Sequence, residues 1–418
     1  MADYTEPAIG VLVVQPTPFC NINCSYCYLP ERDVKAVMAP ATLRALFGKV
    51  FASGWLGAEL TVIWHAGEPL VVPVSFYREA FGMIEALRPA TLRVQHSVQT
   101  NGMLISREWC ELFKSWKVGV GVSIDGPRRF NDAHRMTRDG RSTFERALAG
   151  VRLLRSEGVP FHVISVLTDA SLDAPQEMLE FYRAEGIEDV CFNVEESEGT
   201  HVSGLFASRA PQERFRSFLG HFWRAARADE RIRMIREIDG VLPRVFRPAE
   251  EPLRNIQTVP FGMLNVDCRG NVSTFSPELL GLKNPRYADF IIGNINTDSL
   301  AQMRASPALR AMTRDIEAGV ERCRGSCEYF SVCGGGAPVN KLTENGAFDS
   351  AQTSFCRLTQ MVPVDLVLEA FEQVQRELES EALPPAVRAL FERHGAGAGA
   401  ARALGSNMSN EASLKGSP

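Results

Sequence analysis

Three cysteines near the N-terminus have a spacing that suits a metal-binding loop. Cys20, Cys24 and Cys27 form a C-x3-C-x2-C pattern directly after the apolar run at 11–14. That run predicts a buried strand, which places the cysteines on the loop that leaves the strand's C-terminal end. A cubane iron–sulfur cluster is usually held by four thiolates, so a loop with three would leave one iron with an open coordination position.

An iron with an open position can chelate a small molecule through an amine and a carboxylate. S-adenosylmethionine (SAM) offers this pair, and its sulfonium can then accept an electron from the cluster. A zinc knuckle is one alternative, but the loop has no nearby fourth Cys or His to close a zinc site. Core cysteines are another alternative, but they rarely lie so close together in one loop. With Tyr26 and Tyr28 beside Cys27, the loop resembles that of the radical SAM superfamily.

Apolar runs and amphipathic runs alternate along the first half of the chain. They predict strands at 11–15, 60–64, 92–99, 118–124, 161–167 and 190–194. Helices are expected near 40–53, 75–88, 106–116, 142–157 and 173–185, with a connecting amphipathic helix at 210–230. This alternation implies an α/β fold with a parallel sheet. Six such units predict a partial (β/α)6 TIM-like barrel, as the superfamily resemblance also implies, with the chemistry at the C-terminal ends of the strands.

One helix start carries a specific sequence signal. Ser142, Thr143, Phe144 and Glu145 fit a capping box, in which the Ser and Glu side chains satisfy free N–H groups at the first turn. The helix near 142–157 is therefore expected to begin with that box, and Gly158 suits its C-terminal end.

Four short motifs follow predicted strands and resemble radical SAM motifs that contact the cofactor. They are G-E-P at 67–69, Q-T-N-G at 99–102, S-x-D-G at 123–126 and N-D-A-H-R at 131–135. In the family, the first contacts the amino group of SAM and the serine of the third contacts its ribose. The arginine of the fourth pairs with its carboxylate, a task that suits a guanidinium fork. The resemblance thus implies cofactor contacts by Gly67, Glu68, Pro69, Gln99, Asn101, Ser123, Asp125 and Arg135.

A second set of cysteines lies in the C-terminal third of the chain. Cys323, Cys327 and Cys333 have C-x3-C-x5-C spacing, and Cys356 follows. Four thiolates can complete the ligand set of a zinc ion or of an iron–sulfur cluster. The radical SAM loop in the same chain favours iron–sulfur. The region resembles a SPASM domain, the auxiliary-cluster module of many radical SAM enzymes.

The cysteine pattern is shorter than that of a complete SPASM domain, which has seven cysteines and two auxiliary clusters. Phe275 stands where a partner for Cys268 is expected, and glycines at 334–336 replace another cysteine. Cys268 therefore lacks partners, and one auxiliary [4Fe–4S] cluster is predicted on Cys323, Cys327, Cys333 and Cys356. Cys110 and Cys191 lie inside a predicted helix and strand and are expected in the core.

The segments at 275–281 and 334–356 resemble the Grr-type branch of radical SAM peptide maturases, and the likeness extends from about 9 to 375. It implies a three-residue cyclophane, a bond from an aromatic ring carbon to a β-carbon, in a ribosomally made precursor peptide. Glu278 is the candidate general base, and a flavodoxin- or ferredoxin-type protein is the expected electron donor. The alternatives are formylglycine formation, as in anaerobic sulfatase maturases, and a non-enzymatic metal-binding regulator.

The predicted organisation is a radical SAM core domain at 1–240, a SPASM-like domain at 253–385 and a disordered tail at 390–418. The 418 residues carry a formal net charge of −5, which gives no reason to expect nucleic-acid binding. No apolar stretch approaches the roughly 20 residues that span a bilayer, so no membrane partner is expected. Ten cysteines without a visible secretory signal indicate a reducing compartment, so a cytoplasmic location is predicted.

Overall fold

The computed structural model describes residues 9–198, 201–228, 231–248, 253 and 255–379. Residues 1–364 form one compact unit and residues 365–418 a second. The strands of the described residues all belong to the first unit and form one sheet in the order β10-β9-β8-β1-β2-β3-β4-β5-β6-β7. Their bounds are β1 Ile9–Val14, β2 Leu56–Trp64, β3 Arg93–Thr100, β4 Gly119–Ser123, β5 Phe161–Leu167, β6 Asp189–Val194, β7 Met234–Ile235, β8 Met263–Val266, β9 Asn271–Thr274 and β10 Gly293–Asn294.

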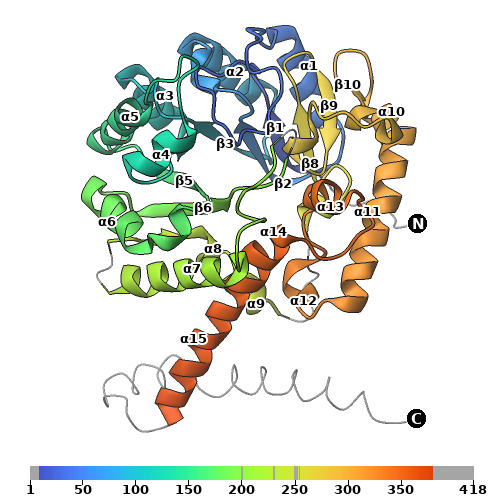
Figure 1. Ribbon diagram of the computed structural model, residues 1–418. Coiled ribbons are helices and arrows are strands. Elements are labelled where there is room, and N and C mark those ends of the chain that lie inside the picture. Colours follow the sequence, from blue (N-terminus) through green and yellow to red (C-terminus); the bar gives the residue numbers. More distant parts are fainter. Residues whose placement is uncertain (1–8, 199–200, 229–230, 249–252, 254, 380–418) are drawn as a thin grey trace, which may run out of the picture. The chain divides into compact units, whose positions relative to one another are not determined.

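Helices connect the parallel strands and lie along the outer side of the sheet (Figure 1). The helices of the first half are α1 Pro40–Phe51, α2 Val74–Leu87, α3 Arg107–Trp116, α4 Arg128–His134, α5 Phe144–Ser156, α6 Pro175–Glu185 and α7 Pro211–Arg227. They are followed by α8 Arg236–Asp239, α9 Leu242–Val245, α10 Leu300–Arg304, α11 Pro307–Ser326, α12 Phe330–Cys333, α13 Pro338–Asn345, α14 Ser354–Cys356 and α15 Val362–Glu379. The six predicted strand–helix units of a parallel α/β fold are confirmed.

Aromatic side chains fill the space between the sheet and its helices. Trp64 of β2 is fully buried and contacts Tyr77 and Phe81 of α2, with ring centroids 5.3 and 5.7 Å away. On β6, Phe192 packs edge-on against Phe218 and Phe222 of α7. These large rings bury much apolar area, which holds the strands in place so that their C-terminal ends can carry a site.

The C-terminal strands extend the same sheet. Val11 of β1 pairs with Thr61 of β2 on one side and with Met263 of β8 on the other, and both pairings are parallel. β9 then pairs antiparallel with β8, and β10 antiparallel with β9. The predicted boundary between a core domain ending at 240 and a second domain from 253 therefore lies inside one compact unit. The predicted tail at 390–418 lies outside the described residues.

The predicted capping box at the start of α5 is wrong. The N-cap is Thr143, and its side chain makes no capping hydrogen bond. Ser142 Oγ accepts from Phe144 N at 3.3 Å but also donates to Asp132, and the Glu145 carboxylate pairs with Arg128 rather than closing the box. α4, which the sequence did not predict, brings Arg128 and Asp132 to this helix start, and their charged groups compete successfully for the capping side chains.

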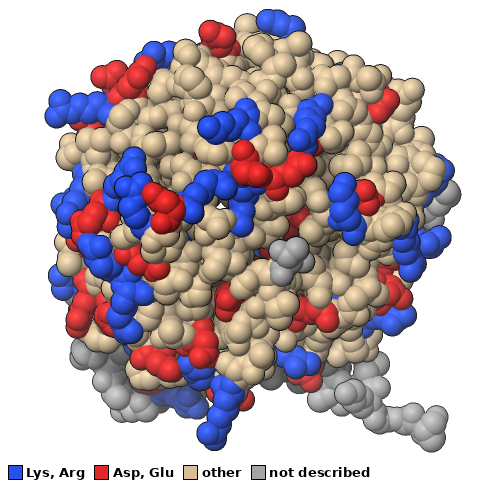
Figure 2. All heavy atoms as spheres, turned by 45° about the horizontal axis from the view of Figure 1, so that its top comes forward, with Lys and Arg blue, Asp and Glu red and all other residues tan. Residues whose placement is uncertain are grey.

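Charged side chains of both signs are intermixed over the face shown in Figure 2. Among the described residues, no helix has the length and apolar character that crossing a membrane requires.

Candidate functional site

A cavity of about 250 Å³ opens where the parallel strands reach their C-terminal ends. Its walls come from the loop after β1, the turn after β2, the C-terminal parts of β3 to β6, the loop after β6, and the short 3-10 turn Pro277–Leu279 that follows β9. Most of the predicted site residues line it together, namely Cys20, Cys24, Cys27, Gly67, Glu68, Gln99, Asn101, Ser123, Arg135 and Glu278. Two predicted cofactor contacts, Pro69 and Asp125, do not line the cavity.

Backbone hydrogen bonds fix the loop that carries the first three cysteines. The amides of Asn23 and Ser25 donate to the carbonyls of Met136 and His134, at 2.8 and 3.0 Å. Two arginine side chains also bind the loop, because Arg138 Nε donates to the Cys20 carbonyl at 3.0 Å and Arg32 Nη1 to the Cys24 carbonyl at 3.1 Å. The segment after α4 therefore shapes the cysteine loop, although it lies more than a hundred residues away in the sequence.

Burial keeps two thiols of this loop, those of Cys20 and Cys24, protonated until a metal binds. Burial, with a smaller contribution from Glu68, raises the pKa of Cys20 to about 12. Burial raises the pKa of Cys24 to about 11, although Arg135 opposes the shift. Without metal both groups stay neutral near pH 7, and binding a cationic iron centre releases their protons.

Gly67 lets the turn after β2 pack directly against the cysteine loop. Its φ is +101°, and a Cβ atom there would lie 2.3 Å from the Thr17 carbonyl oxygen. The next amide, of Glu68, donates to the Phe19 carbonyl at 2.9 Å. Only glycine accommodates both the backbone conformation and this close approach.

The Glu68 side chain is an internal hydrogen-bond acceptor. It is 1% exposed and accepts from Leu70 N and Thr100 Oγ1 at 2.9 and 2.6 Å through Oε1. Its Oε2 accepts from Asn101 N at 2.8 Å. Burial raises the pKa of Glu68, and these three donors oppose that shift. The carboxylate thus ties the end of β2 to the end of β3, beneath the cavity.

Asp125 positions two residues that do line the cavity. Tyr26 donates its hydroxyl to Asp125 Oδ2 at 2.5 Å, and Arg135 Nε lies 2.9 Å from the same oxygen. The second oxygen accepts from Val166 N. Among the described residues, the Nη atoms of Arg135 donate no hydrogen bond. The guanidinium group can therefore bind a carboxylate such as that of SAM.

Amides and a hydroxyl complete the wall between the strand ends. Gln99 Nε2 donates to Ser123 Oγ at 2.8 Å, and Asn101 Nδ2 donates to Asn21 Oδ1 of the cysteine loop at 2.7 Å. His65 also faces the cavity, and burial lowers its pKa to about 4. The residues present therefore fit a cluster that has three thiolate ligands and a small zwitterionic cofactor beside it.

Several acidic side chains also line the cavity. Glu196 accepts from Asn340 Nδ2 of α13 at 2.6 Å, and Glu278 accepts from the Ser276 hydroxyl. Burial, reinforced by the neighbouring Glu196 and Glu278 charges, raises the pKa of Glu198, and burial raises that of Glu278. A raised pKa makes each of these carboxylates a stronger base than an exposed one, which is a property that a general base requires.

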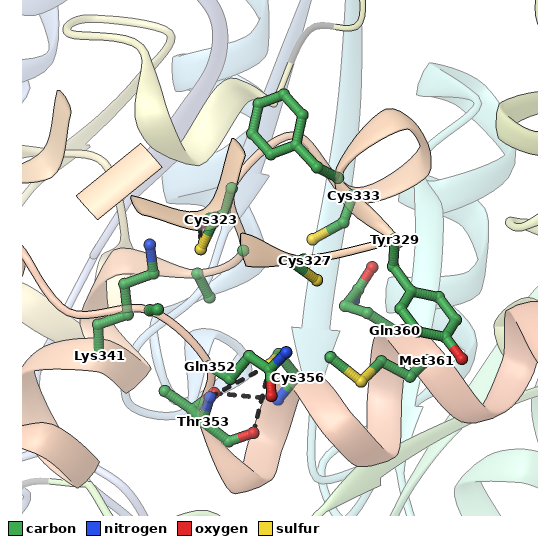
Figure 3. A pocket seen from close by; sticks show the side chains of 15 residues that line it. Cys323, Cys327, Tyr329, Cys333, Lys341, Gln352, Thr353, Cys356, Gln360 and Met361 are labelled. Atoms are coloured by element: carbon green, nitrogen blue, oxygen red, sulfur yellow. Dashed lines mark hydrogen bonds between the residues drawn. The ribbon is translucent and has the colours of Figure 1, made fainter. Parts of the chain in front are cut away.

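The four C-terminal cysteines line a second cavity. Cys323 is near the end of α11, Cys327 caps that helix, Cys333 ends α12 and Cys356 ends α14. Figure 3 shows the sulfurs of Cys323, Cys327 and Cys333 facing a common space, with Cys356 on its opposite side. In the described part of the chain, no three His, Cys, Asp or Glu side chains have the geometry of a site for a single metal ion.

A glycine run shapes the wall next to Cys333. Gly334, Gly335 and Gly336 all have positive φ, and a Cβ on Gly335 would lie 2.8 Å from the Val320 side chain. Burial raises the pKa of Cys333, while the backbone N–H groups of Gly336 and Gly335 point at its sulfur and oppose that shift. The glycines at the missing cysteine position thus offer N–H donors to a thiolate.

The remaining cysteines lie apart from these cavities. Cys110 and Cys191 are 0% and 3% exposed, and their predicted place in the core is confirmed. Cys268, in the turn between β8 and β9, lines neither cavity.

A parallel α/β sheet with a three-cysteine loop at its C-terminal edge defines an enzyme that uses an iron–sulfur cluster with SAM. Residues 14–182 match the model of the radical SAM superfamily. The uncharacterized protein sll1766 of Synechocystis is 38% identical over 369 residues, which cover 87% of this chain and 92% of that protein. The serine-type anaerobic sulfatase-maturating enzyme of Bacteroides thetaiotaomicron is 23% identical over 377 residues, which cover 85% and 88%.

This chain belongs to the radical SAM superfamily, so it is an enzyme, and the family's [4Fe–4S] cluster and SAM are its cofactors. The alternative of a non-enzymatic regulator is therefore wrong. Among solved structures, native anSMEcpe with bound AdoMet has a TM-score of 0.71 at 18% identity and covers 87% of this chain and 98% of its own. Streptococcus suis SuiB bound to precursor peptide SuiA has a TM-score of 0.57 at 14% identity, with 84% and 76% covered. These two likenesses show the shared fold.

The sequence motifs did not indicate several residues of the two cavities. Glu195, Glu196 and Glu198 were visible only as an acidic loop after the sixth strand. In the structure Glu195 and Glu198 are buried, and Glu196 is half-buried and accepts from Asn340 of α13. Lys341 lines the four-cysteine cavity. In the sequence it belongs to the segment at 334–356, which indicated a family resemblance but no role for this lysine. Its burial, which draws attention to it, is visible only in the structure.

Proposed function

We propose that this enzyme is a peptide maturase that installs a three-residue cyclophane in a ribosomally made precursor peptide. The observation that carries the proposal is the pairing of one three-cysteine cavity, which includes Glu278, with one separate four-cysteine cavity. A peptide substrate is supported by the structural neighbours, because SuiB is bound to precursor peptide SuiA and anSMEcpe to the Cp18Cys peptide.

When bound, the cluster and SAM supply a 5′-deoxyadenosyl radical that can take a hydrogen atom from an unactivated β-carbon, and an auxiliary cluster supplies an electron acceptor. Cys20, Cys24 and Cys27 would hold the first cluster. Arg135, aligned by Asp125, would bind the SAM carboxylate. Glu68 would keep the turn with Gly67 in the shape that contacts SAM. Cys323, Cys327, Cys333 and Cys356 would hold the single auxiliary cluster.

The peptide loses two hydrogens in this reaction. A β-carbon–hydrogen bond breaks, a bond forms from that carbon to an aromatic ring carbon, and the ring then loses one proton and one electron. Glu278 is the proposed acceptor of the ring proton, because burial raises the pKa of its carboxyl group and the group faces the same cavity as the cysteine loop. A flavodoxin- or ferredoxin-type donor in the cytoplasm would supply the electron that starts each cycle.

The cluster assignment is tested by replacing Cys20, Cys24 and Cys27 with alanine. The variant should release no 5′-deoxyadenosine from SAM, and iron in anaerobically purified protein should fall from about eight to about four per chain. A matched variant, Cys110→Ala, removes a core cysteine and should keep both the iron and the cleavage. SAM cleavage by the triple variant, or about twelve irons in the parent, would overturn the assignment.

The sulfatase-maturase-like relatives favour a second candidate reaction, oxidation of Cys or Ser to formylglycine. Both reactions on Ser remove two hydrogens, so intact mass does not separate them. Peptides encoded beside the gene should be incubated with the enzyme, SAM and reductant, and the products fragmented by tandem mass spectrometry. A cyclophane suppresses cleavage within its ring, whereas an aldehyde product fragments along the whole backbone and reacts with hydrazines.

A further inference from the structure

Lys341 is a buried lysine on the wall of the four-cysteine cavity. Its side chain belongs to α13, and the residue is 3% exposed. The ammonium donates to the carbonyl oxygen of Gly319 at 2.9 Å. Among the described residues, no carboxylate forms an ion pair with it.

The helix α11 carries both the acceptor of this ammonium and one of the predicted cluster ligands. Gly319 lies one helical turn before Cys323, so the Lys341 anchor is on the same helix as a predicted cluster ligand. Lys341 and Cys323 both line this cavity and appear on the same side of it in Figure 3. Gly319 must lack a side chain here, because a Cβ would lie 2.2 Å from the Phe348 carbonyl oxygen.

Burying an ammonium with one carbonyl partner is costly unless an opposite charge is near. Lys49 provides a contrast, because its part-buried ammonium donates to the two carbonyls of Ile295 and Asp298 and does not line the cavity. Two carbonyl partners explain Lys49 as a structural residue. For Lys341, a cluster held by four thiolates would supply the opposite charge, because such a cluster is negatively charged overall.

We infer that Lys341 is the internal counter-ion of the cluster held by Cys323, Cys327, Cys333 and Cys356, and that it raises the reduction potential of that cluster. The inference rests on the auxiliary cluster of the proposed function. Reduction adds one electron, so a fixed positive charge beside the cluster stabilises the reduced form. Lys341 thereby tunes how readily the cluster accepts an electron, without serving as its ligand.

The test uses the full chain with Cys20, Cys24 and Cys27 replaced by alanine, so that one cluster remains. Dithionite titration followed by electron paramagnetic resonance gives its midpoint potential. Lys341→Met should shift the midpoint to a more negative value at unchanged iron content. Lys341→Arg, which keeps the charge, should restore most of the parent value. Lys49→Met, the matched control, should leave the midpoint unchanged.

The midpoint potential and the iron content of the variants together decide whether the inference holds. An unshifted midpoint in Lys341→Met with full iron overturns it, and so does equal loss of iron from the Met and Arg variants, which indicates packing alone. Loss of iron from the Met variant with retention in the Arg variant supports it, because the charge is then what the cluster requires. If the parent itself holds no iron, the auxiliary cluster of the proposed function fails, and the role of Lys341 falls with it.

Discussion

Glu196 shows how one side chain in the cavity can make folding stability depend on pH. Burial is the main reason that its pKa rises to about 8, although the hydrogen bond from Asn340 opposes the rise. The folded chain therefore keeps a proton that the unfolded chain releases near pH 4.5. A raised acid pKa gives a stability contribution that is present below the unfolded value and is lost as pH rises through the folded one.

From this we predict that the free energy of unfolding falls between about pH 6 and 9, by about 2 kcal/mol from this group. Glu196→Gln should remove that share of the slope. Denaturant unfolding of the anaerobic protein at the two pH values measures it. The exposed Glu85, paired with Arg88 on α2, supplies a control, since Glu85→Gln should leave the slope in place. Equal slopes in wild type and Glu196→Gln would contradict the prediction.

Gly67 gives a second prediction at the scale of one residue. Alanine there must adopt a φ of +101° and clash with the Thr17 carbonyl, so Gly67→Ala should cost at least about 3 kcal/mol. Gly54 also has positive φ but nothing within 4 Å, so Gly54→Ala should cost only about 1 kcal/mol. Chemical denaturation compares the two. Because Gly67 contacts the cysteine loop, its variant should also bind less iron than the Gly54 variant, and equal losses would refute the role given to this contact.

At the scale of elements, the first six strands were predictable because each is a short apolar run between helices with clear periodicity. A strand that is buried between helices is marked by its own apolar run, so β5 has the bounds that the sequence predicted. The capping of α5 was not predictable, since the competing Arg128 lies on α4, a seven-residue helix without a clear pattern. The G-E-P turn was found, but the sequence could not tell that the Glu68 carboxylate accepts backbone N–H groups of its own chain.

The candidate site was predictable at the level of motifs and not at the level of contacts. Ten of the predicted residues share one cavity because parallel strands end at the same edge of the sheet. Asp125 lies behind the cavity wall, since its carboxylate is used by Tyr26, Arg135 and the Val166 amide. Such roles depend on which way a side chain turns after the strand ends, and spacing in the sequence carries no information about that.

At the scale of the molecule, the parallel pairing of β1 with β8 determines which fragments of the chain can fold alone. A fragment of residues 1–240 lacks β8 and leaves the backbone groups of one edge of β1 unpaired. We predict that this fragment is insoluble or aggregated, as size-exclusion chromatography would show. The matched truncation, which removes only residues 390–418, should keep the stability, iron content and activity of the whole chain. A monomeric, cooperatively unfolding 1–240 fragment would show that the first units do not need β8.

The pairing of Val11 with Met263 also sets an order of events during synthesis. The first strand emerges from the ribosome early, but its second neighbour is made only after most of the parallel strands have been translated. The loop with Cys20, Cys24 and Cys27 follows that strand, so its surroundings are completed late. Iron insertion into the nascent chain would meet an unfinished pocket, and delivery after release from the ribosome suits this topology better.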